Sequence, residues 1–227
     1  MQIREWMTNN VITVTPETSL FKASKLMKEH QIRRLPVLDE HDRLIGIVSD
    51  RDVKAASPSR ATTLDMYELM YLLSEIKVRD VMTTSPVSIS PDQTVETGSL
   101  IMEEKGFGGL PVVDADNKVI GIITDHDIFK VLVTITGVRH GGLHLAFEVD
   151  DAPGTMRPIF DVLRDHKAVI VSMLASSSEP FSTDKHRIYI RVRSMDSEQE
   201  KTLIAALSRA FTLVYWIRDG VQAEQAG

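Results

Sequence analysis

The 227-residue sequence contains no cysteine, which excludes disulfides and thiol catalysis and favours a cytoplasmic protein. Its first residues, MQIREWMTNN, lack the apolar segment of a signal peptide, and no apolar run approaches the roughly 18 residues that a membrane helix needs. Excess positive charge is also missing, since the formal net charge is −6 and there is no basic tail. We therefore expect neither a membrane nor a nucleic acid as a partner.

What the sequence does contain is a repeat. GIVSDRDV begins at Gly46 and GIITDHDI begins at Gly121, an interval of 75 residues. At the same interval, the LPV that begins at Leu35 recurs at Leu110. About fifty residues align without a gap and roughly a third of them are identical, which predicts an internal duplication.

Both copies have the same predicted element order, β-α-β-β-α. A β-rich run ends at Pro16 in the first copy and at Pro91 in the second, because proline cannot continue a central strand. A helix, a strand through LPV, a polar turn and a second strand follow, and a further helix is expected from Asp50 and from Asp125. About fifty residues form a marginal core alone, so we expect the two copies to pack together.

The early proline, the central LPV and the closing glycine–aliphatic–x–Ser/Thr–x–x–Asp resemble the CBS motif, which occurs in tandem pairs. The resemblance covers roughly residues 1 to 135. It places motif 1 in 1–55, a connecting loop and helix in 56–76, and motif 2 in 77–135. It implies two clefts that bind AMP, ADP, ATP or S-adenosylmethionine, with no obligatory cofactor and with Mg²⁺ only as a companion of the nucleotide.

The resemblance also implies roles for individual residues. The closing aspartates, Asp52 and Asp127, are expected on the ribose hydroxyls, and a carboxylate is suited to a cis-diol. Ser49 and Thr124 are expected near ribose or phosphate. The expected nucleotide site also includes residues at the early prolines: Thr13, Pro16, Ser88 and Pro91. A simpler interpretation remains open, in which the hydroxyls only cap helices and the aspartates only favour the helix dipole.

The two copies differ in charge at positions expected to face the clefts. Three arginines of the first copy stand against two glycines and a histidine of the second: Arg33, Arg34 and Arg51 against Gly108, Gly109 and His126. Arginine pairs well with phosphate oxygens, whereas glycine lets the backbone approach closely. We therefore expect two unequal clefts, unless these arginines are merely solvated surface residues. Between the copies, DMYELMYLLSEI predicts a helix that packs with Met66, Met70, Leu73 and Ile76 in the core or at a dimer contact.

The last part of the chain has a different pattern. Leu143, Leu145 and Phe147 alternate as in a half-buried strand, and the later segments predict the order β-α-β-β-α-β of a ferredoxin-like fold. The class of the whole chain is therefore α+β. Residues 142–218 resemble an ACT domain, which senses small molecules, often amino acids, and usually pairs between chains, so a homodimer is expected. The matching ligand loop consists of Asp151, Pro153, Gly154 and Thr155, but DHKAV lacks the glycine and asparagine of many ACT domains.

Tandem CBS motifs followed by an ACT domain, together with SDRDVKAASPS, resemble the acetoin utilization protein family of bacteria. The resemblance implies a regulatory role near acetoin or acetate metabolism, and the protein that is regulated stays unknown. An enzyme is the second hypothesis, with His126 as an acid–base group, but no nucleophile–base set, P-loop or metal-ligand cluster is found. His140 and His144 flank a double glycine and do not predict a metal site. Two further hypotheses are an S-adenosylmethionine sensor and an assembly module that binds no ligand.

Overall fold

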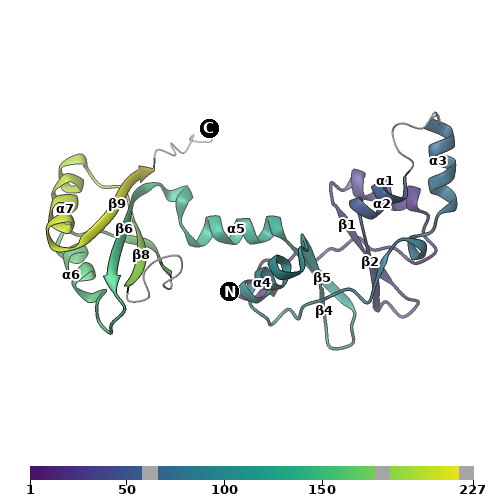
Figure 1. The fold of residues 1–227 in the computed structure, drawn as a ribbon, viewed down its shortest axis with the longest axis horizontal. Helices are drawn as coiled ribbons and strands as arrows, with labels where there is room; N and C mark the ends of the chain where they lie inside the picture. The colour runs from purple at the N-terminus through teal and green to yellow at the C-terminus, as the bar shows by residue number, and fades with distance from the viewer. Residues whose placement is uncertain (58–65, 177–184, 220–227) are drawn as a thin grey trace. The chain divides into compact units, whose positions relative to one another are not determined.

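The computed structural model describes residues 1–57, 66–176 and 185–219 (Figure 1). The chain divides into two compact units, Met1–Ile128 and Phe129–Gly227. None of the helices in the described ranges combines the length and the apolarity that a membrane crossing requires.

The first unit contains both copies of the repeat. The first copy contributes α1 (Leu20–Glu29), β1 (Arg34–Leu38), β2 (Leu44–Ser49) and α2 (Asp50–Ala56). The second copy contributes β3 (Thr83–Thr84), α4 (Val95–Lys105), β4 (Gly109–Val113), β5 (Val119–Thr124) and the start of α5 (Asp125–Ile135), which continues into the second unit from Phe129. Two single 3₁₀ turns, η1 (Ile3–Glu5) and η2 (Val78–Asp80), begin the copies, and α3 (Met66–Glu75) connects them.

The β-rich runs before Pro16 and Pro91 do not form the predicted first strands. Val14 instead makes one parallel bridge, in which its N–H donates to Pro36 O at 3.0 Å and its carbonyl accepts from Leu38 N at 2.9 Å. A longer ladder would need the N–H of Pro36 on one side and that of Pro16 on the other, and proline has none. The second copy repeats this arrangement around Ile89.

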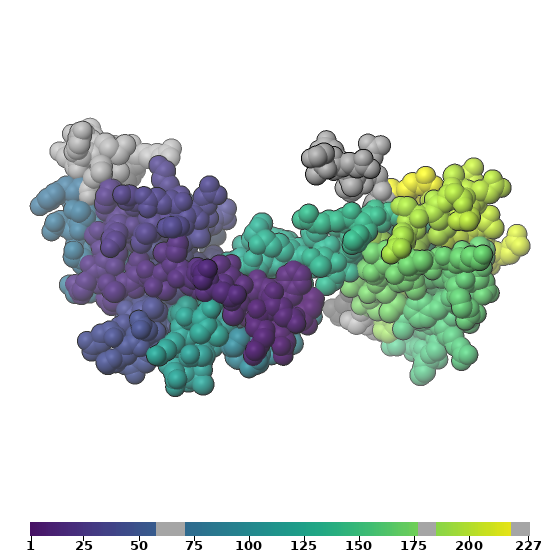
Figure 2. All heavy atoms as spheres, turned by 180° about the vertical axis from the view of Figure 1, so that it is seen from behind, coloured from purple at the N-terminus to yellow at the C-terminus, as the bar shows by residue number. Residues whose placement is uncertain are grey.

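The opening segment of each copy packs on the other copy. Ile3 N donates to Gln93 O at 2.9 Å, and the equivalent Val78 N donates to Thr18 O at 2.9 Å. Both side chains, Ile3 and Val78, are fully buried. Figure 2 shows the purple N-terminal residues bordering the teal residues of the second copy. The expected packing of the two copies is therefore confirmed. Each copy binds the opening segment of the other, an arrangement that we call the exchange of opening segments.

Two glycines make room for this exchange. A Cβ on Gly46 would lie 2.5 Å from Met82 Sδ, and a Cβ on Gly121 would collide with Met7 Sδ in the same way. The repeated glycine of GIVSDRDV and GIITDHDI therefore accommodates the methionine that the opposite copy contributes. In the turns between β1 and β2 and between β4 and β5, the exposed Arg43 forms a bridge with Lys118, its own equivalent 75 residues later, so the copies are related by an approximate two-fold axis.

Helices cover the sheets with the faces that the sequence predicts. Leu20, Ala23 and Met27 of α1 are buried, as are Val95, Gly98 and Met102 at the equivalent positions of α4. In α3, Leu73 is buried in the core of the first copy, with Ile76 packed against it. The side chains of Met66 and Met70 lie outside the part that the structure describes.

The second unit has the predicted order β-α-β-β-α-β. Its elements are β6 (Gly142–Asp150), α6 (Arg157–Asp165), β7 (Ile170–Ser176), β8 (Lys185–Val192), α7 (Ser197–Ala210) and β9 (Thr212–Asp219). The strands form one antiparallel sheet in the order β7-β8-β6-β9, the ferredoxin-like arrangement. Leu143, Leu145 and Phe147 of β6 pack with Ile159 of α6 and Leu203 of α7 in its core.

Candidate functional site

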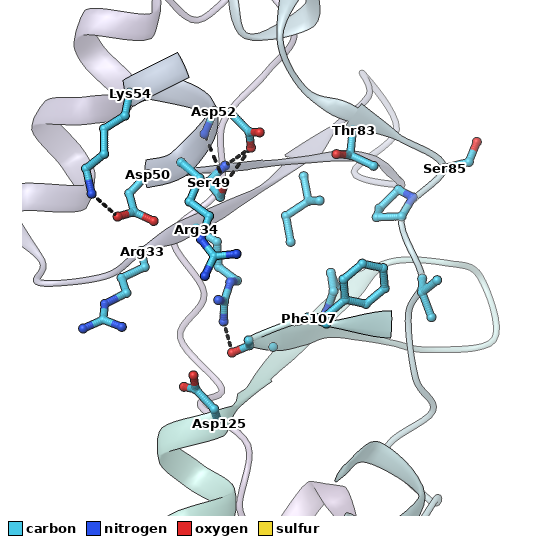
Figure 3. Close-up of a pocket in the computed structure, with 18 residues that line it drawn as sticks. Arg33, Arg34, Ser49, Asp50, Asp52, Lys54, Thr83, Ser85, Phe107 and Asp125 are labelled. Carbon is cyan, nitrogen blue, oxygen red and sulfur yellow. Dashed lines mark hydrogen bonds and ion pairs between the residues drawn. The ribbon is translucent and has the colours of Figure 1, made fainter. Parts of the chain in front are cut away.

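A cleft of about 760 Å³ lies in the first unit and takes its walls from both copies (Figure 3). The first copy contributes the start of β1, the end of β2 and the start of α2. The second copy contributes the chain from Thr83 to Val87, the residues around the start of β4, and Asp125. The lining residues are Arg33, Arg34, Ile47, Ser49, Asp50, Arg51, Asp52, Lys54, Thr83, Ser85, Pro86, Val87, Gly106, Phe107, Gly108, Gly109, Pro111 and Asp125. This volume is in the range of ordinary small-molecule sites.

Ser49 and Asp52 form a capping box at the mouth of α2. Asp52 Oδ2 accepts from Ser49 N and from Ser49 Oγ, both at 2.7 Å, and Ser49 Oγ accepts from Asp52 N at 3.4 Å. Thr124 and Asp127 repeat the motif, with distances of 3.0 and 2.7 Å to Asp127 Oδ2. The simpler interpretation as caps thus describes the geometry of all four residues, and the ribose role stays a prediction.

The arginines of the first copy occupy different environments. Arg33 and Arg51 are exposed along the cleft, whereas Arg34 is half-buried and its Nη1 donates to the carbonyl oxygen of Gly108. Burial lowers the pKa of Arg34, and the carboxylates of Asp125 and Asp50 oppose this effect. Arginine starts so far above neutral pH that it stays charged.

Asp50 interacts with three of the cationic side chains of this cleft, namely Lys54, Arg33 and Arg51. Its Oδ2 accepts from Lys54 Nζ at 2.8 Å. This hydrogen bond, together with the charges of Arg33 and Arg51, lowers the pKa of Asp50. In total, the lining includes four cationic and three acidic side chains, although the whole chain is acidic. The cleft is therefore locally suited to an anion.

An apolar wall faces these charges. Phe107 is 42% exposed and Val87 is 40% exposed, and both line the cleft together with Pro86 and Ile47. Exposed aromatic and branched side chains beside a cleft offer a flat apolar surface to a ring system. Alignment of equivalent positions does not predict this wall, because the exchange of opening segments pairs Thr83 and Thr84 with Ile47 and Gly46 in the middle of β2.

The cleft unites five of the predicted nucleotide-site residues: Arg33, Arg34, Ser49, Arg51 and Asp52. Seven others are not among its lining residues: Thr13, Pro16, Ser88, Pro91, Thr124, His126 and Asp127. Pro16 O accepts from Arg79 N at 3.1 Å, and Pro91 O accepts from Arg4 N at 3.1 Å, so these prolines hold the exchanged turns. Thr124, His126 and Asp127 are the equivalents of Ser49, Arg51 and Asp52 and belong to the symmetry-related side of the pair.

The predicted ligand loop of the second unit precedes α6. Asp151, Pro153 and Gly154 are exposed, and Asp151 Oδ1 lies 2.6 Å from His186 Nε2. Gly154 has φ +88°, a conformation that favours glycine. A cavity of about 350 Å³ in this unit lies elsewhere, between the end of α5 and the sheet, with Leu132, Val138, His144, Leu174, Tyr189 and Arg191 among its lining residues. Among the described residues no group of three or more His, Cys, Asp or Glu side chains is arranged to hold a metal ion.

Comparison with known proteins agrees with the duplicated first unit. A sequence profile of the CBS domain matches residues 3–59 and 78–134. A CBS domain-containing protein from Dictyostelium discoideum is 30% identical over 133 residues, which are 59% of this chain and 92% of that protein. Inosine-5'-monophosphate dehydrogenase from Methanocaldococcus jannaschii is 36% identical over 126 residues, but the match spans 56% of this chain and only 22% of the enzyme.

A solved structure extends the comparison. A Vibrio cholerae protein, proposed to be the acetoin utilization protein AcuB, superimposes with a TM-score of 0.50 and 29% identity, covering 61% of this chain and 95% of that one. The matched domains therefore occur both in small proteins built almost entirely from the pair and as a minor part of an enzyme.

Proposed function

Since the chain belongs to the CBS domain family, we propose that it is a regulatory protein without catalytic activity that binds an adenosine nucleotide in the cleft between its two copies. The observation that carries the proposal is the composition of this cleft. Arg33 and Arg51 are exposed along one part of the lining, and Phe107 and Val87 form an apolar wall. A nucleotide has matching parts, since its phosphates are anionic and its base is a flat ring.

Each part of a nucleotide has a candidate partner. The planar guanidinium groups of Arg33 and Arg51 suit phosphate oxygens. Phe107 and Val87 suit the purine. The carboxylate of Asp52 and the hydroxyls of Ser49 and Thr83 suit the ribose. The proposal covers both the free nucleotide and its Mg²⁺ complex, and it includes no obligatory cofactor.

Thermal unfolding and calorimetry with adenosine, AMP, ADP, ATP and S-adenosylmethionine test this proposal. A nucleotide present at a hundred times its Kd should stabilise the protein by about 2.7 kcal/mol. If only S-adenosylmethionine binds, the protein is instead a sensor of that compound. No binding of any adenine compound at millimolar concentration would contradict the proposal and favour a module that serves only in assembly.

Phosphate selectivity should depend on the two exposed arginines. The variant Arg33→Gly, Arg51→His copies the second repeat into the first. Each exposed arginine contributes roughly 1 kcal/mol at most to a phosphate contact. ATP should therefore lose more affinity than AMP, and adenosine should lose none. Arg43→Gly, which removes an exposed arginine outside the lining of the cleft, is the control, and an equal loss for all three ligands would show that the arginines support the fold instead.

We further propose that the second unit is an ACT domain that joins two chains and senses a small, amino-acid-like molecule. The topology supports this proposal, and β7 and β9 form the two edges of the described sheet. Strand β9 exposes Val214, Tyr215, Trp216 and Ile217, each by more than a third. Light scattering should give a dimer for the wild-type chain and a monomer for Ile217→Lys. A monomeric wild-type chain would remove this unit from any interface.

The process that the protein regulates is proposed from the resemblance to the acetoin utilization family and from the similarity to the Vibrio cholerae protein. A strain that lacks the protein should grow more slowly on acetoin than its parent and equally well on glucose. Affinity capture from that organism with and without ATP would identify the regulated protein. Equal growth on acetoin would contradict this assignment and leave the nucleotide proposal intact.

A further inference from the structure

Arg34 and Gly109 are equivalent positions of the repeat, and the structure brings them into contact. The guanidinium of Arg34 reaches the start of β4, where Nη1 donates to the carbonyl oxygen of Gly108 and lies against Gly109 (Figure 3). Arg34 of the first copy thus contacts the backbone of the second copy at Gly109, the position equivalent to its own.

Both glycines are needed for this contact. A Cβ on Gly108 would lie 2.5 Å from Arg34 Nη2, and a Cβ on Gly109 would collide with Nη1 and lie 2.8 Å from the carbonyl oxygen of Ile123. Neither glycine has a positive φ, so backbone conformation alone does not demand glycine at 108 or 109. The guanidinium of Arg34 occupies the space that side chains at positions 108 and 109 would fill, and we call this space the seat of Arg34.

The seat holds Arg34 only moderately. The acceptor is a neutral carbonyl, and the nearest opposing charges are Asp125 and Asp50, while Arg33 and Arg51 repel the guanidinium. A phosphate bound at the two exposed arginines would neutralise that repulsion. It would also offer Arg34 a charged acceptor, which is stronger than a neutral carbonyl.

We propose that Arg34 is a latch residue that exchanges the carbonyl of Gly108 for a phosphate of the bound ligand. This inference rests on the proposed nucleotide site and adds to it a contact that competes with the ligand. The resting contact lowers the affinity for phosphorylated ligands by the free energy needed to break it. When a ligand binds, the exchange removes Arg34 from Asp125, the first residue of α5.

Gly108→Ala tests the latch because the atoms nearest to the new methyl group are the far ends of two side chains, those of Arg34 and Asp125. It should push Arg34 from its seat without removing its charge. A hydrogen bond from a charged donor is worth about 1.5–3 kcal/mol net, so ATP affinity should rise roughly 10- to 150-fold. Adenosine affinity should not change. In the Arg34→Ala background, Gly108→Ala should have no effect on ATP.

Calorimetry on the full chain gives a decision in each case. If the wild type binds ATP and Gly108→Ala binds it equally or more weakly, the latch is wrong and the nucleotide site stands. If the wild type binds no nucleotide, both proposals fail. If Gly108→Ala does not fold, Arg34→Gln replaces it, because glutamine can keep the neutral contact but has no charge for the phosphate. This variant should weaken ATP and spare adenosine, and wild-type ATP affinity would overturn the latch.

Discussion

The two copies of the repeat share a backbone plan but differ where they face each other. Most equivalent residues have equivalent roles: Ile3 and Val78 fill the opposite core, and Gly46 and Gly121 admit the opposite methionine. Arg34 and Gly109 do the reverse, because one fills the space that the other leaves. Near an approximate two-fold axis, equivalent residues meet, and two arginines there would repel each other. The comparison teaches that a duplicated chain can become asymmetric at its axis while its cores stay alike.

The largest effect is expected where the copies are most alike. Ile3→Ala removes a fully buried side chain that packs on Gly98 of the second copy, and it should reduce the free energy of unfolding by about 2–5 kcal/mol. Val78→Ala, its equivalent, should cost less because fewer methylene groups are lost. Urea unfolding of both variants measures this, with the exposed Leu100→Ala as control. A loss below about 1 kcal/mol for Ile3→Ala would refute the exchange of opening segments.

The two capping boxes, Ser49–Asp52 and Thr124–Asp127, make the same hydrogen bonds but differ in how deeply the aspartate is buried. Asp127 is 4% exposed, whereas Asp52 is only half-buried, and both carboxylates accept from a backbone N–H and a hydroxyl. Asp127→Asn should cost about 1.5–3 kcal/mol, since these hydrogen bonds lose their charge. Asp52→Asn should cost less because water reaches the site. Thermal unfolding of the two variants decides the order, and the opposite order would contradict it.

The asymmetry at the axis can be broken in two steps. Gly109→Ala should destabilise the protein by about 1–3 kcal/mol, because its Cβ meets both Arg34 and the carbonyl of Ile123. In an Arg34→Gly background the same substitution should cost less, but not nothing, because the carbonyl remains 2.8 Å from the Cβ position. A double-mutant cycle by chemical unfolding measures the difference. Strictly additive effects would mean that Arg34 does not lie on Gly109 in solution.

The smallest effect on stability is expected for the ion pair between Lys54 and Asp50, to which the second copy has no equivalent lysine. Lys54 donates to Asp50, whereas the second copy has Phe129 at the equivalent of Lys54. The pair lowers the pKa of Asp50, so its contribution is present above the unfolded pKa, near pH 4, and is lost as the pH falls through the lowered folded pKa. Lys54→Ala should cost about 0.3–0.5 kcal/mol at neutral pH.

A pH series of thermal unfolding checks this pair. The difference between Lys54→Ala and the wild type should disappear at strongly acidic pH. Lys22→Ala is a control, because Lys22 is likewise an exposed lysine early in a helix but lies outside the cleft lining. A difference that is constant across pH would show that the lysine stem, not the ion pair, is responsible.

Much of this fold could be predicted from the sequence because its signals are local. The LPV strands, the amphipathic faces of α1 and α4 and the hydroxyl caps at Ser49 and Thr124 depend on residues within one or two turns. The β-rich runs at Val14 and Ile89 misled the prediction because the pairing partner contains a proline, which no local pattern of the run itself reveals.

The site was harder to predict than the fold. Ser49 and Asp52 could be predicted because the repeat contains them in both copies, and Arg33 because the two copies differ in charge at its position. The structure places all three on one cleft. Phe107 and Thr83 could not, because they reach the cleft from the other copy, and an alignment of the copies does not show which surfaces face each other. From sequence, Gly108 and Gly109 are only the uncharged counterparts of arginines, whereas in the structure they are the surface on which Arg34 rests.

The exchanged opening turns also constrain how the protein is made. During synthesis, Ile3 leaves the ribosome long before Gln93 and Gly98, the residues of the second copy that receive it. The first copy likewise waits for Val78, so neither half can complete its core while the chain is still short. Translation therefore produces an unfinished intermediate with exposed apolar side chains, the kind of species on which chaperones act. A fusion partner at the amino terminus would be attached next to the second copy, because Met1 O accepts a hydrogen bond from Val95 N at the start of α4.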